Sequence, residues 1–227
     1  FQSNGINLLS GYGMTEATGG ITMTPIDEYQ PDSVGVPLPG IQLTLADDGE
    51  LLINGPYVSS SYFGKNNGST LVDGWFHTGD IFNENNDHYY IIDRKKEIYK
   101  NSRGQTISPQ KIENMFQDFD GIKSAFLVGD GLEFNTLLIY SEPDSLPMDI
   151  SNASLVTIRE YYSSLVQSVN SFLAPFERVI NFAIIKRDFN SDDELTQKGT
   201  YKRKQILKNF REIINPMYEK NYITLSY

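Results

Sequence analysis

The chain has 227 residues, 39% of them hydrophobic and 12% aromatic, with a formal net charge of −10 and an isoelectric point near 4.7. This composition supports a packed core and excludes a disordered chain. The acidic balance argues against nucleic acid or an anionic membrane as the main partner.

The residue types also exclude several kinds of site. The chain has no Cys, which excludes disulfides and thiolate zinc sites, and His77 and His88 are too few for a His-rich metal site. No apolar run reaches the roughly 18–20 residues of a membrane span, and no signal peptide is recognisable, so we expect a cytoplasmic protein. The first residues, FQSNGINLL, lack an initiator Met, so we expect the chain to begin inside a longer protein.

Residues 1–94 are predicted to be mostly β. Short apolar or alternating runs, separated by turns rich in Pro, Gly and Asp, predict strands at 6–10, 42–46 and 50–54. The DDG between the last two predicts a hairpin. Two more strands are predicted within DGWFHTGDIF and DHYYIIDR, joined by the polar turn NENND.

Residues 95–227 alternate between helix and strand patterns. A Ser followed by Pro109 opens a predicted helix in SPQKIENMFQDF. Strands are predicted in IKSAFLVGD and EFNTLLIYS, a helix in SNASLVTIREYYSSLVQSVNSFL, a strand in FERVINFAII, and a last helix in TYKRKQILKNFREIIN up to Pro216. This is an α+β unit large enough to be a domain of its own.

The stretch GYGMTE has the residue types of a ligand site. Gly11 and Gly13 would let the backbone approach a ligand closely, and Tyr12 offers a flat face. Thr15 and Glu16 could contact a phosphate or Mg²⁺. The alternative is that a strand ends here and a turn follows.

Asp80, in DGWFHTGD, is a second candidate. It follows a glycine at the predicted end of a strand, and a carboxylate there can accept both hydroxyls of a ribose. The alternative is a turn Asp that bonds its own backbone.

Two basic runs stand out in this acidic chain. DRKKEIYKNSRGQTISPQKIE gathers five cations around a glycine and ahead of a helix, which suits either an anionic ligand or a solvated linker. ELTQKGTYKRK places cations at a predicted helix N-terminus, where they oppose the helix dipole, and this favours an anion-binding role. The five cations of the first run are Arg94, Lys95, Lys96, Lys100 and Arg103.

In this order, the four motifs resemble the adenylate-forming superfamily, which contains acyl-CoA synthetases, luciferases and the adenylation domains of peptide synthetases. WFHTGDI with DRKKEI is most similar to the long-chain fatty acyl-CoA synthetases. The resemblance spans the whole chain but only the C-terminal portion of the family, because no phosphate-binding loop of the SGTTG.PK kind is present. It implies that residues 1–94 are the β-rich C-terminal part of a large adenylation domain and that residues 95–227 are a small, mobile α+β lid.

The resemblance also implies a role for each motif residue. Glu16 would hold Mg²⁺, Lys96 would be the hinge between the two domains, and Lys100 and Gly104 would lie in the loop that faces CoA. Residues implied in catalysis are Thr15, Glu16 and Lys198. Residues implied in nucleotide binding are Gly11, Tyr12, Gly13, Thr15, Asp80 and Arg94.

One position departs from the family. The family ends with a Gly-Lys pair whose lysine stabilises charge on the attacking carboxylate and the α-phosphate, and Gly199-Thr200 stands there in this chain. Lys198 and Lys202 are the neighbouring candidates for this role, and we favour Lys198. A weakened first half-reaction is the alternative.

The implied activity is that of a ligase of fatty acid metabolism. ATP activates a fatty acid as acyl-adenylate with release of pyrophosphate, Mg²⁺ assists, and CoA takes the acyl group while AMP leaves. The alternative is a non-catalytic or carrier-loading relative that binds nucleotide or an acyl carrier protein. We expect this chain alone to be inactive and, through exposed edges and apolar surface, prone to self-association.

Overall fold

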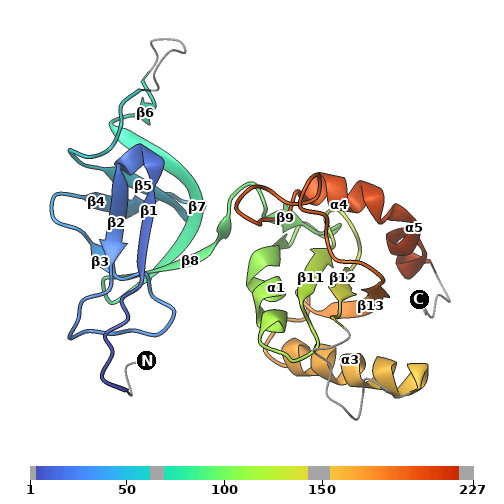
Figure 1. Cartoon of the computed structure of the whole chain (residues 1–227). Coiled ribbons are helices and arrows are strands. Elements are labelled where there is room, and N and C mark those ends of the chain that lie inside the picture. Colours follow the sequence, from blue (N-terminus) through green and yellow to red (C-terminus); the bar gives the residue numbers. More distant parts are fainter. Residues whose placement is uncertain (1–3, 62–68, 143–153, 220–227) are drawn as a thin grey trace. The chain divides into compact units, whose positions relative to one another are not determined.

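A computed structural model of the chain describes residues 4–61, 69–142 and 154–219 (Figure 1). The chain forms two compact units, residues 1–96 and 97–227. No helix among the described residues is both long enough and apolar enough to cross a membrane.

The first unit consists of two antiparallel sheets, shown in blue to green in Figure 1. The smaller sheet has the order β1-β2-β3, formed by β1 (Gly11–Met14), β2 (Gly19–Met23) and β3 (Val36–Pro37), and the 3₁₀ helix η2 (Thr15–Ala17) joins β1 to β2. The larger sheet has the order β4-β5-β7-β6 with β8 also paired to β7, and its strands are β4 (Gln42–Leu45), β5 (Glu50–Asn54), β6 (Leu71–Val72), β7 (Trp75–Asn85) and β8 (His88–Arg94). The predicted hairpin of residues 42–54 is confirmed.

One apolar core holds the two sheets together. β7 alternates buried and more exposed side chains along most of its length, as expected for a strand with one covered face. Each large apolar side chain so buried contributes about 1.5–3 kcal/mol. The buried members of this core are Ala17, Ile21, Ile41, Leu51, Ile53, Phe76, Phe82 and Tyr89.

The predicted strand at residues 6–10 is wrong. These residues have no regular structure, and Ile6 and Leu8 are 53% and 57% exposed. The strand instead starts at Gly11, because the pairing partner β2 lies opposite Gly11–Met14, with a bulge between Tyr12 and Gly13. A Cβ atom at Gly13 would collide with the carbonyl oxygen of Gly19 on β2, so the close approach of two strands accounts for this glycine.

The second unit is a three-stranded sheet with helices on both faces (Figure 1). β11 (Ser124–Val128) pairs with β12 (Asn135–Tyr140) antiparallel, and β12 pairs with β13 (Val179–Ile185) parallel. A two-stranded hairpin, β9 (Tyr99–Lys100) with β10 (Thr106–Ile107), precedes it. The remaining elements are α1 (Pro109–Gln117), β11 (Ser124–Val128), β12 (Asn135–Tyr140), α3 (Leu155–Asn170), β13 (Val179–Ile185), α4 (Arg203–Asn209), α5 (Arg211–Ile214) and the 3₁₀ helix η4 (Asn215–Tyr218).

The alternation of side chains along the strands builds two cores, one on each face of this sheet. On β11, Ala125 and Leu127 pack into the core shared with α1 and α3, whereas Phe126 and Val128 pack into the core shared with α4 and α5. This arrangement confirms the predicted α+β class.

The sequence pattern predicts one continuous last helix, but the structure contains two helices instead. The helical segment is divided into α4 and α5 at Phe210, whose backbone leaves helical geometry at φ −101° and ψ 14°. The Phe210 ring is buried against Phe189, with a centroid distance of 5.6 Å, and the Arg187 guanidinium lies 4.7 Å from its centroid. Pro216 lies in η4, beyond the α-helical part.

We predict that Gly13→Ala destabilises the first unit by about 2 kcal/mol or more, because the added methyl group overlaps backbone that cannot move aside. Urea unfolding followed by the fluorescence of Trp75, the single Trp of the chain, measures this unit. Gly20→Ala is the matched control, since its Cβ would meet only the mobile end of Leu38 at 3.0 Å. Equal losses for the two variants would contradict the explanation.

Candidate functional site

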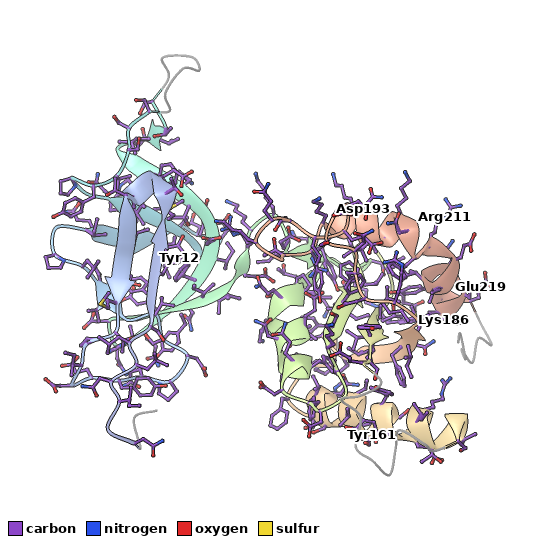
Figure 2. All side chains as sticks on the ribbon, in the orientation of Figure 1. Tyr12, Tyr161, Lys186, Asp193, Arg211 and Glu219 are labelled. Carbon is purple, nitrogen blue, oxygen red and sulfur yellow. The ribbon has the colours of Figure 1, made fainter. Side chains whose placement is uncertain are left out.

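Asp80 is the centre of a cluster that unites three residues singled out in the sequence. The Tyr12 hydroxyl donates a hydrogen bond to Asp80 Oδ2 at 2.6 Å, and Arg94 Nε lies 2.8 Å from Asp80 Oδ1. The Asp80 side chain is 7% exposed and that of Arg94 65% exposed, so the pair runs from the interior to the surface. All three residues lie in the first unit, where Figure 2 labels Tyr12 on β1.

A bulge in β7 aims the Asp80 carboxylate. Leu52 pairs with His77 and Glu50 with Ile81, so a single residue of β5 lies opposite residues 78–80 of β7. Bulges redirect side chains in this way. Asp80 is also the direct partner of Arg94 in the β7–β8 ladder, which brings the two side chains together.

Contacts within the bulge hold its shape. The Thr78 hydroxyl donates to the carbonyl of Leu51 at 2.8 Å and accepts the Asp80 N–H at 3.1 Å. Gly79 has φ +73°, a conformation that favours glycine. Asp80 is thus presented by a bonded backbone.

Tyr12 acts as a hydrogen-bond donor throughout the neutral pH range. Burial and the hydrogen bond to Asp80 raise the pKa of the Tyr12 phenol well above its usual value. Its ring packs edge-on against Phe82, with centroids 4.9 Å apart. The phenol therefore orients Asp80 and does not compete with it for protons.

The cluster fits a ribose diol. An ionised carboxylate has about four lone-pair directions, and Tyr12 and Arg94 use one on each oxygen of Asp80. Acceptor capacity remains for two hydroxyl donors. The exposed Arg94 guanidinium lies beside the same carboxylate, where a nucleotide phosphate could reach it.

Thr15 and Glu16 are in η2, directly after β1. Thr15 is exposed and Glu16 is half-buried, and the Glu16 carbonyl accepts the N–H of Ser59 at 2.7 Å. Within the described ranges, no group of three or more His, Cys, Asp or Glu side chains could hold a metal ion. A single carboxylate such as Glu16 suits Mg²⁺, which keeps several waters and takes substrate phosphates as further ligands.

Sequence reasoning missed Glu50, which is buried beside this cluster. Its carboxylate accepts hydrogen bonds from the Gly79 N–H at 2.9 Å, from Lys95 Nζ at 2.8 Å and from His77 Nδ1 at 2.9 Å. Burial raises the pKa of the Glu50 carboxyl, but the bonds from Lys95, His77 and Gly79 outweigh burial and place the pKa below its usual value. The Gly49-Glu50 dipeptide after the predicted turn carries no sequence signal for this role.

The predicted hinge residue, Lys96, is exposed and lies between two anchored neighbours. Lys95 is bound to Asp48 and Glu50 in the first unit, at 2.6 and 2.8 Å. Glu97 is bound to Arg203 Nε in the second unit, at 2.9 Å. Each neighbour thus belongs firmly to its own unit.

Lys198 lies at the tip of a narrow turn. Leu195 and Tyr201 form an antiparallel bridge, and the hydroxyls of Thr196 and Thr200 lie 2.8 Å apart. Lys198 is exposed. Its surroundings differ from those of Lys202, the other lysine considered for the catalytic role.

Lys202 follows the turn, and its Nζ donates to the carbonyl of Asp192 at 3.3 Å. Thr200, predicted from the sequence to stand at the family's lysine position, has its hydroxyl 2.8 Å from that of Thr196. Of the two lysines, Lys198 is the one that projects from the turn tip.

Two buried carboxylate–arginine pairs anchor the turn. Before it, the fully buried Glu194 binds both terminal nitrogens of Arg187 at 2.7 Å and accepts from Asn209 at 2.6 Å. After it, Arg203 binds both oxygens of Glu113 at 2.7 and 2.6 Å. The anion-binding role predicted for this basic run stays a prediction, and Arg203 itself is bound to the internal carboxylates of Glu113 and Glu97.

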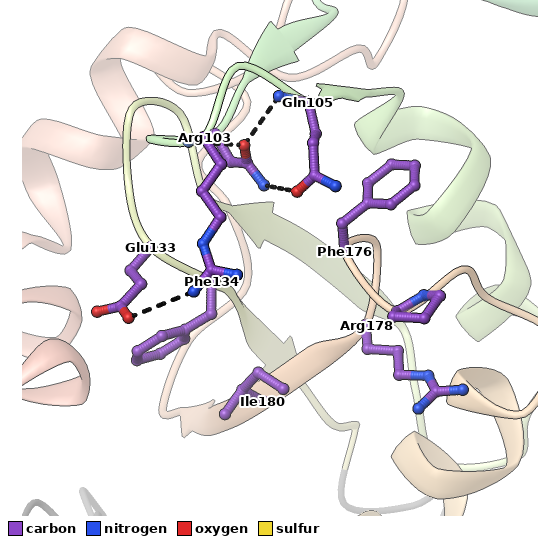
Figure 3. Close-up of a pocket in the computed structure, with 9 residues that line it drawn as sticks. Arg103, Gln105, Glu133, Phe134, Phe176, Arg178 and Ile180 are labelled. Atoms are coloured by element: carbon purple, nitrogen blue, oxygen red, sulfur yellow. Dashed lines mark hydrogen bonds and ion pairs between the residues drawn. The ribbon is translucent and has the colours of Figure 1, made fainter.

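A cavity of about 330 Å³ lies beside the loop predicted to face CoA (Figure 3). Asn101, Arg103 and Gln105 line it from that loop, and Arg103 pairs weakly with Glu133 at 3.8 Å. Gly104, at the loop tip, has φ +77° and no atom within 4 Å of an added Cβ. The other lining residues are Phe134, Pro175, Phe176, Arg178 and Ile180.

Lys100 is the last residue of β9, and its side chain is exposed. Its carbonyl accepts the N–H of Gly131 at 2.9 Å, which ties the hairpin to the β11–β12 connection. Its predicted place in the loop that faces CoA stays a prediction.

Comparison with known proteins agrees with this geometry. Residues 97–222 match the family profile described as "AMP-binding enzyme C-terminal domain", and residues 1–63 match the one described as "AMP-binding enzyme". The first match covers more than half of the chain. The chain therefore belongs to the AMP-binding enzyme family.

Curated relatives are fatty-acid–CoA ligases. The chain is 31% identical over 236 aligned positions to long-chain-fatty-acid–CoA ligase FadD15 of Mycobacterium bovis, which covers 97% of this chain and 39% of that protein. It is 28% identical to human long-chain-fatty-acid–CoA ligase 1, covering 94% of this chain and 35% of that protein. The chain thus spans well under half of these relatives.

Solved structures share the fold. The o-succinylbenzoate CoA synthetase of Bacillus subtilis, in complex with its acyl-adenylate intermediate, matches with a TM-score of 0.71 at 20% identity, over 90% of this chain and 42% of that one. The anthranilate CoA ligase AuaEII in complex with anthranoyl-AMP matches with a TM-score of 0.69, also at 20% identity. They confirm the predicted fold, a β-rich part followed by an α+β unit.

We predict that Glu194→Gln destabilises the second unit at neutral pH. The hydrogen bonds from Arg187 outweigh burial and lower the pKa of Glu194 from 4.5 to about 2. Because the pKa of Glu194 is lower in the folded state, the stability that its ionised carboxylate contributes is complete above about pH 4.5. This contribution is lost as the pH falls toward 2. We expect a cost of about 2–3 kcal/mol at neutral pH.

Urea unfolding followed by far-ultraviolet circular dichroism measures this cost, because the described α-helices all lie in the second unit. Asp193→Asn, at the exposed neighbouring position, is the control and should change stability little. If Glu194→Gln lowers the stability near pH 2 as much as it does at neutral pH, the ionic origin of the stability loss is refuted.

Proposed function

We propose that this chain is the C-terminal part of an ATP-dependent acyl-CoA synthetase that activates a fatty acid as acyl-adenylate and transfers the acyl group to CoA. The observation that carries the proposal is the Asp80 cluster, in which Tyr12 and Arg94 hold a buried carboxylate with acceptor capacity left for a ribose. Membership of the AMP-binding family and the names of the relatives support it.

Two displacements make up the proposed reaction. A carboxylate oxygen of the fatty acid attacks the α-phosphorus of ATP, a P–O bond forms, and pyrophosphate leaves. The thiol sulfur of CoA then attacks the acyl carbon, a C–S bond forms, and AMP leaves with the C–O electron pair while the thiol proton is released. Mg²⁺ held by Glu16 would neutralise phosphate charge.

The protein residues act mainly by positioning, which is a large catalytic term in reactions of this kind. Asp80 and Arg94 would hold the ribose and an adjacent phosphate, and Tyr12 would keep Asp80 aimed. Thr15, the first residue of η2 after β1, would contact the phosphates. Gly11 and Gly13 keep this strand close to β2, as their collisions with β2 on adding a Cβ indicate.

The second substrate would meet the second unit. The cavity beside Gly104 presents the cations Arg103 and Arg178 and the rings of Phe134 and Phe176, a combination that suits an anionic thiol compound with an aromatic base. In Figure 3, Phe176 and Arg178 lie across the cavity from Phe134. Lys96, between its two anchored neighbours, would carry the change of domain orientation between the two steps.

A second candidate function is a nucleotide or acyl-carrier binding module without adenylation activity. Thr200 favours it, because this residue occupies the family's lysine position and its hydroxyl is committed to Thr196. Under the main proposal, Lys198 at the turn tip supplies the missing charge.

We predict fatty-acid-dependent exchange of labelled pyrophosphate into ATP by the longer protein that contains this chain. Asp80→Asn should lower the exchange rate at subsaturating ATP about 100-fold, because a charged hydrogen-bond acceptor of the ribose is lost. Asp87→Asn, in the exposed β7–β8 turn where Asn tolerates φ +64°, should have wild-type exchange. Absence of exchange with medium and long acids would overturn the enzyme proposal in favour of the binding module.

Lys198→Ala should lower the pyrophosphate exchange about 100-fold or more, because charge that develops in the transition state loses its partner. Lys202→Ala should have a small effect, since its Nζ is bound to the Asp192 carbonyl. The same exchange assay compares the two variants at saturating ATP. The reverse order of effects would assign the role to Lys202, and two active variants would show that neither lysine is needed.

A further inference from the structure

We propose that Glu50 is a positioning residue of the nucleotide site: it binds the two residues that flank the Asp80–Arg94 pair, Gly79 through its backbone N–H and Lys95 through its side-chain ammonium, and thereby sets the aim of the Asp80 carboxylate toward a ribose. The inference rests on the proposed function for the identity of the ligand. The contacts that carry it all lie within the first unit.

Both oxygens of the buried Glu50 carboxylate bind residues next to the Asp80–Arg94 pair. Oε1 accepts the N–H of Gly79, the residue before Asp80, at 2.9 Å. Oε2 accepts from Nζ of Lys95, the residue after Arg94, at 2.8 Å. Glu50 therefore ties β5 to the chain neighbours of both partners.

The bulge makes this tie necessary. Residues 78–80 lie opposite a single residue of β5, so the Gly79 N–H cannot make a regular ladder bond. An N–H that is shielded from water and has no acceptor is costly, and Glu50 supplies the acceptor to this partly buried N–H. The Gly79 carbonyl accepts the N–H of Lys95 at 2.8 Å, so the same side chain closes a ring of contacts that includes both strands.

Neighbouring contacts provide a control. Asp48 also binds Lys95, at 2.6 Å, but its side chain is 51% exposed, and it has no contact with Gly79 among the described residues. Asp48→Asn thus removes an ion pair of Lys95 and leaves in place the hydrogen bond from the Gly79 N–H to Glu50, here called the clamp. Glu50→Ala removes both its own ion pair with Lys95 and the clamp.

The test compares the affinities of the full-length protein for AMP and for the dideoxy analogue that lacks both ribose hydroxyls, by titration calorimetry. We expect the wild type to prefer AMP about 100-fold, and Glu50→Ala to reduce this preference to about tenfold or less without weakening the analogue. In an Asp80→Ala background, adding Glu50→Ala should change the preference no further, because Glu50 acts through Asp80. Asp48→Asn should keep the wild-type preference.

An equal loss of affinity for both ligands would overturn the inference, since a merely structural residue would weaken them alike. If circular dichroism shows that Glu50→Ala does not fold, Glu50→Gln replaces it. Glu50→Gln keeps an acceptor for Gly79 and should give an intermediate preference. A wild type that binds neither ligand, or binds them equally, would refute the proposed function.

Amide hydrogen exchange at Gly79 separates the two failures, because it needs no ligand. We expect exchange at Gly79 to become at least about tenfold faster in Glu50→Ala than in the wild type, and to change less in Glu50→Gln, which keeps an acceptor. Unchanged protection would refute the clamp itself, whatever the protein binds.

Discussion

The hydrogen-bonded carboxylate of Asp80 is the interaction on which the first unit's functional geometry depends. It is buried, and Tyr12 binds one of its oxygens while Arg94 binds the other. A buried charge of this kind is tolerated only when it is paired and hydrogen-bonded. The bulge in β7 and the β1–β2 hairpin, with glycines where the strands approach, supply these partners.

In the second unit, too, buried carboxylates with several hydrogen bonds hold the candidate residues' surroundings in place. Glu194 and Arg203 lie before and after the turn that carries Lys198, and each is part of an ion pair whose carboxylate is buried and bound by several hydrogen bonds. The turn tip is therefore exposed while its base is rigid. Lys95 and Glu97 repeat this arrangement around Lys96, since each is bound within its own unit. Exposed lysines between anchored neighbours are well suited to act on a ligand or to change conformation.

Much of this was accessible from the sequence, for identifiable reasons. Asp80 and Arg94 stand in short motifs whose residue types match their chemistry, and regular alternation predicted the β4–β5 hairpin. The strand at residues 6–10 was wrong because apolar character alone does not reveal where the pairing partner lies. The break at Phe210 was missed because a buried ring overrode helical periodicity, and Glu50 was missed because its role depends on a register offset between β5 and β7.

A structure of the full-length protein with AMP tests the central claim most directly. The account predicts that both ribose hydroxyls lie within hydrogen-bond distance of the Asp80 carboxylate while Tyr12 and Arg94 keep their contacts to it. A nucleotide bound elsewhere, or a ribose that leaves Asp80 untouched, would contradict the account.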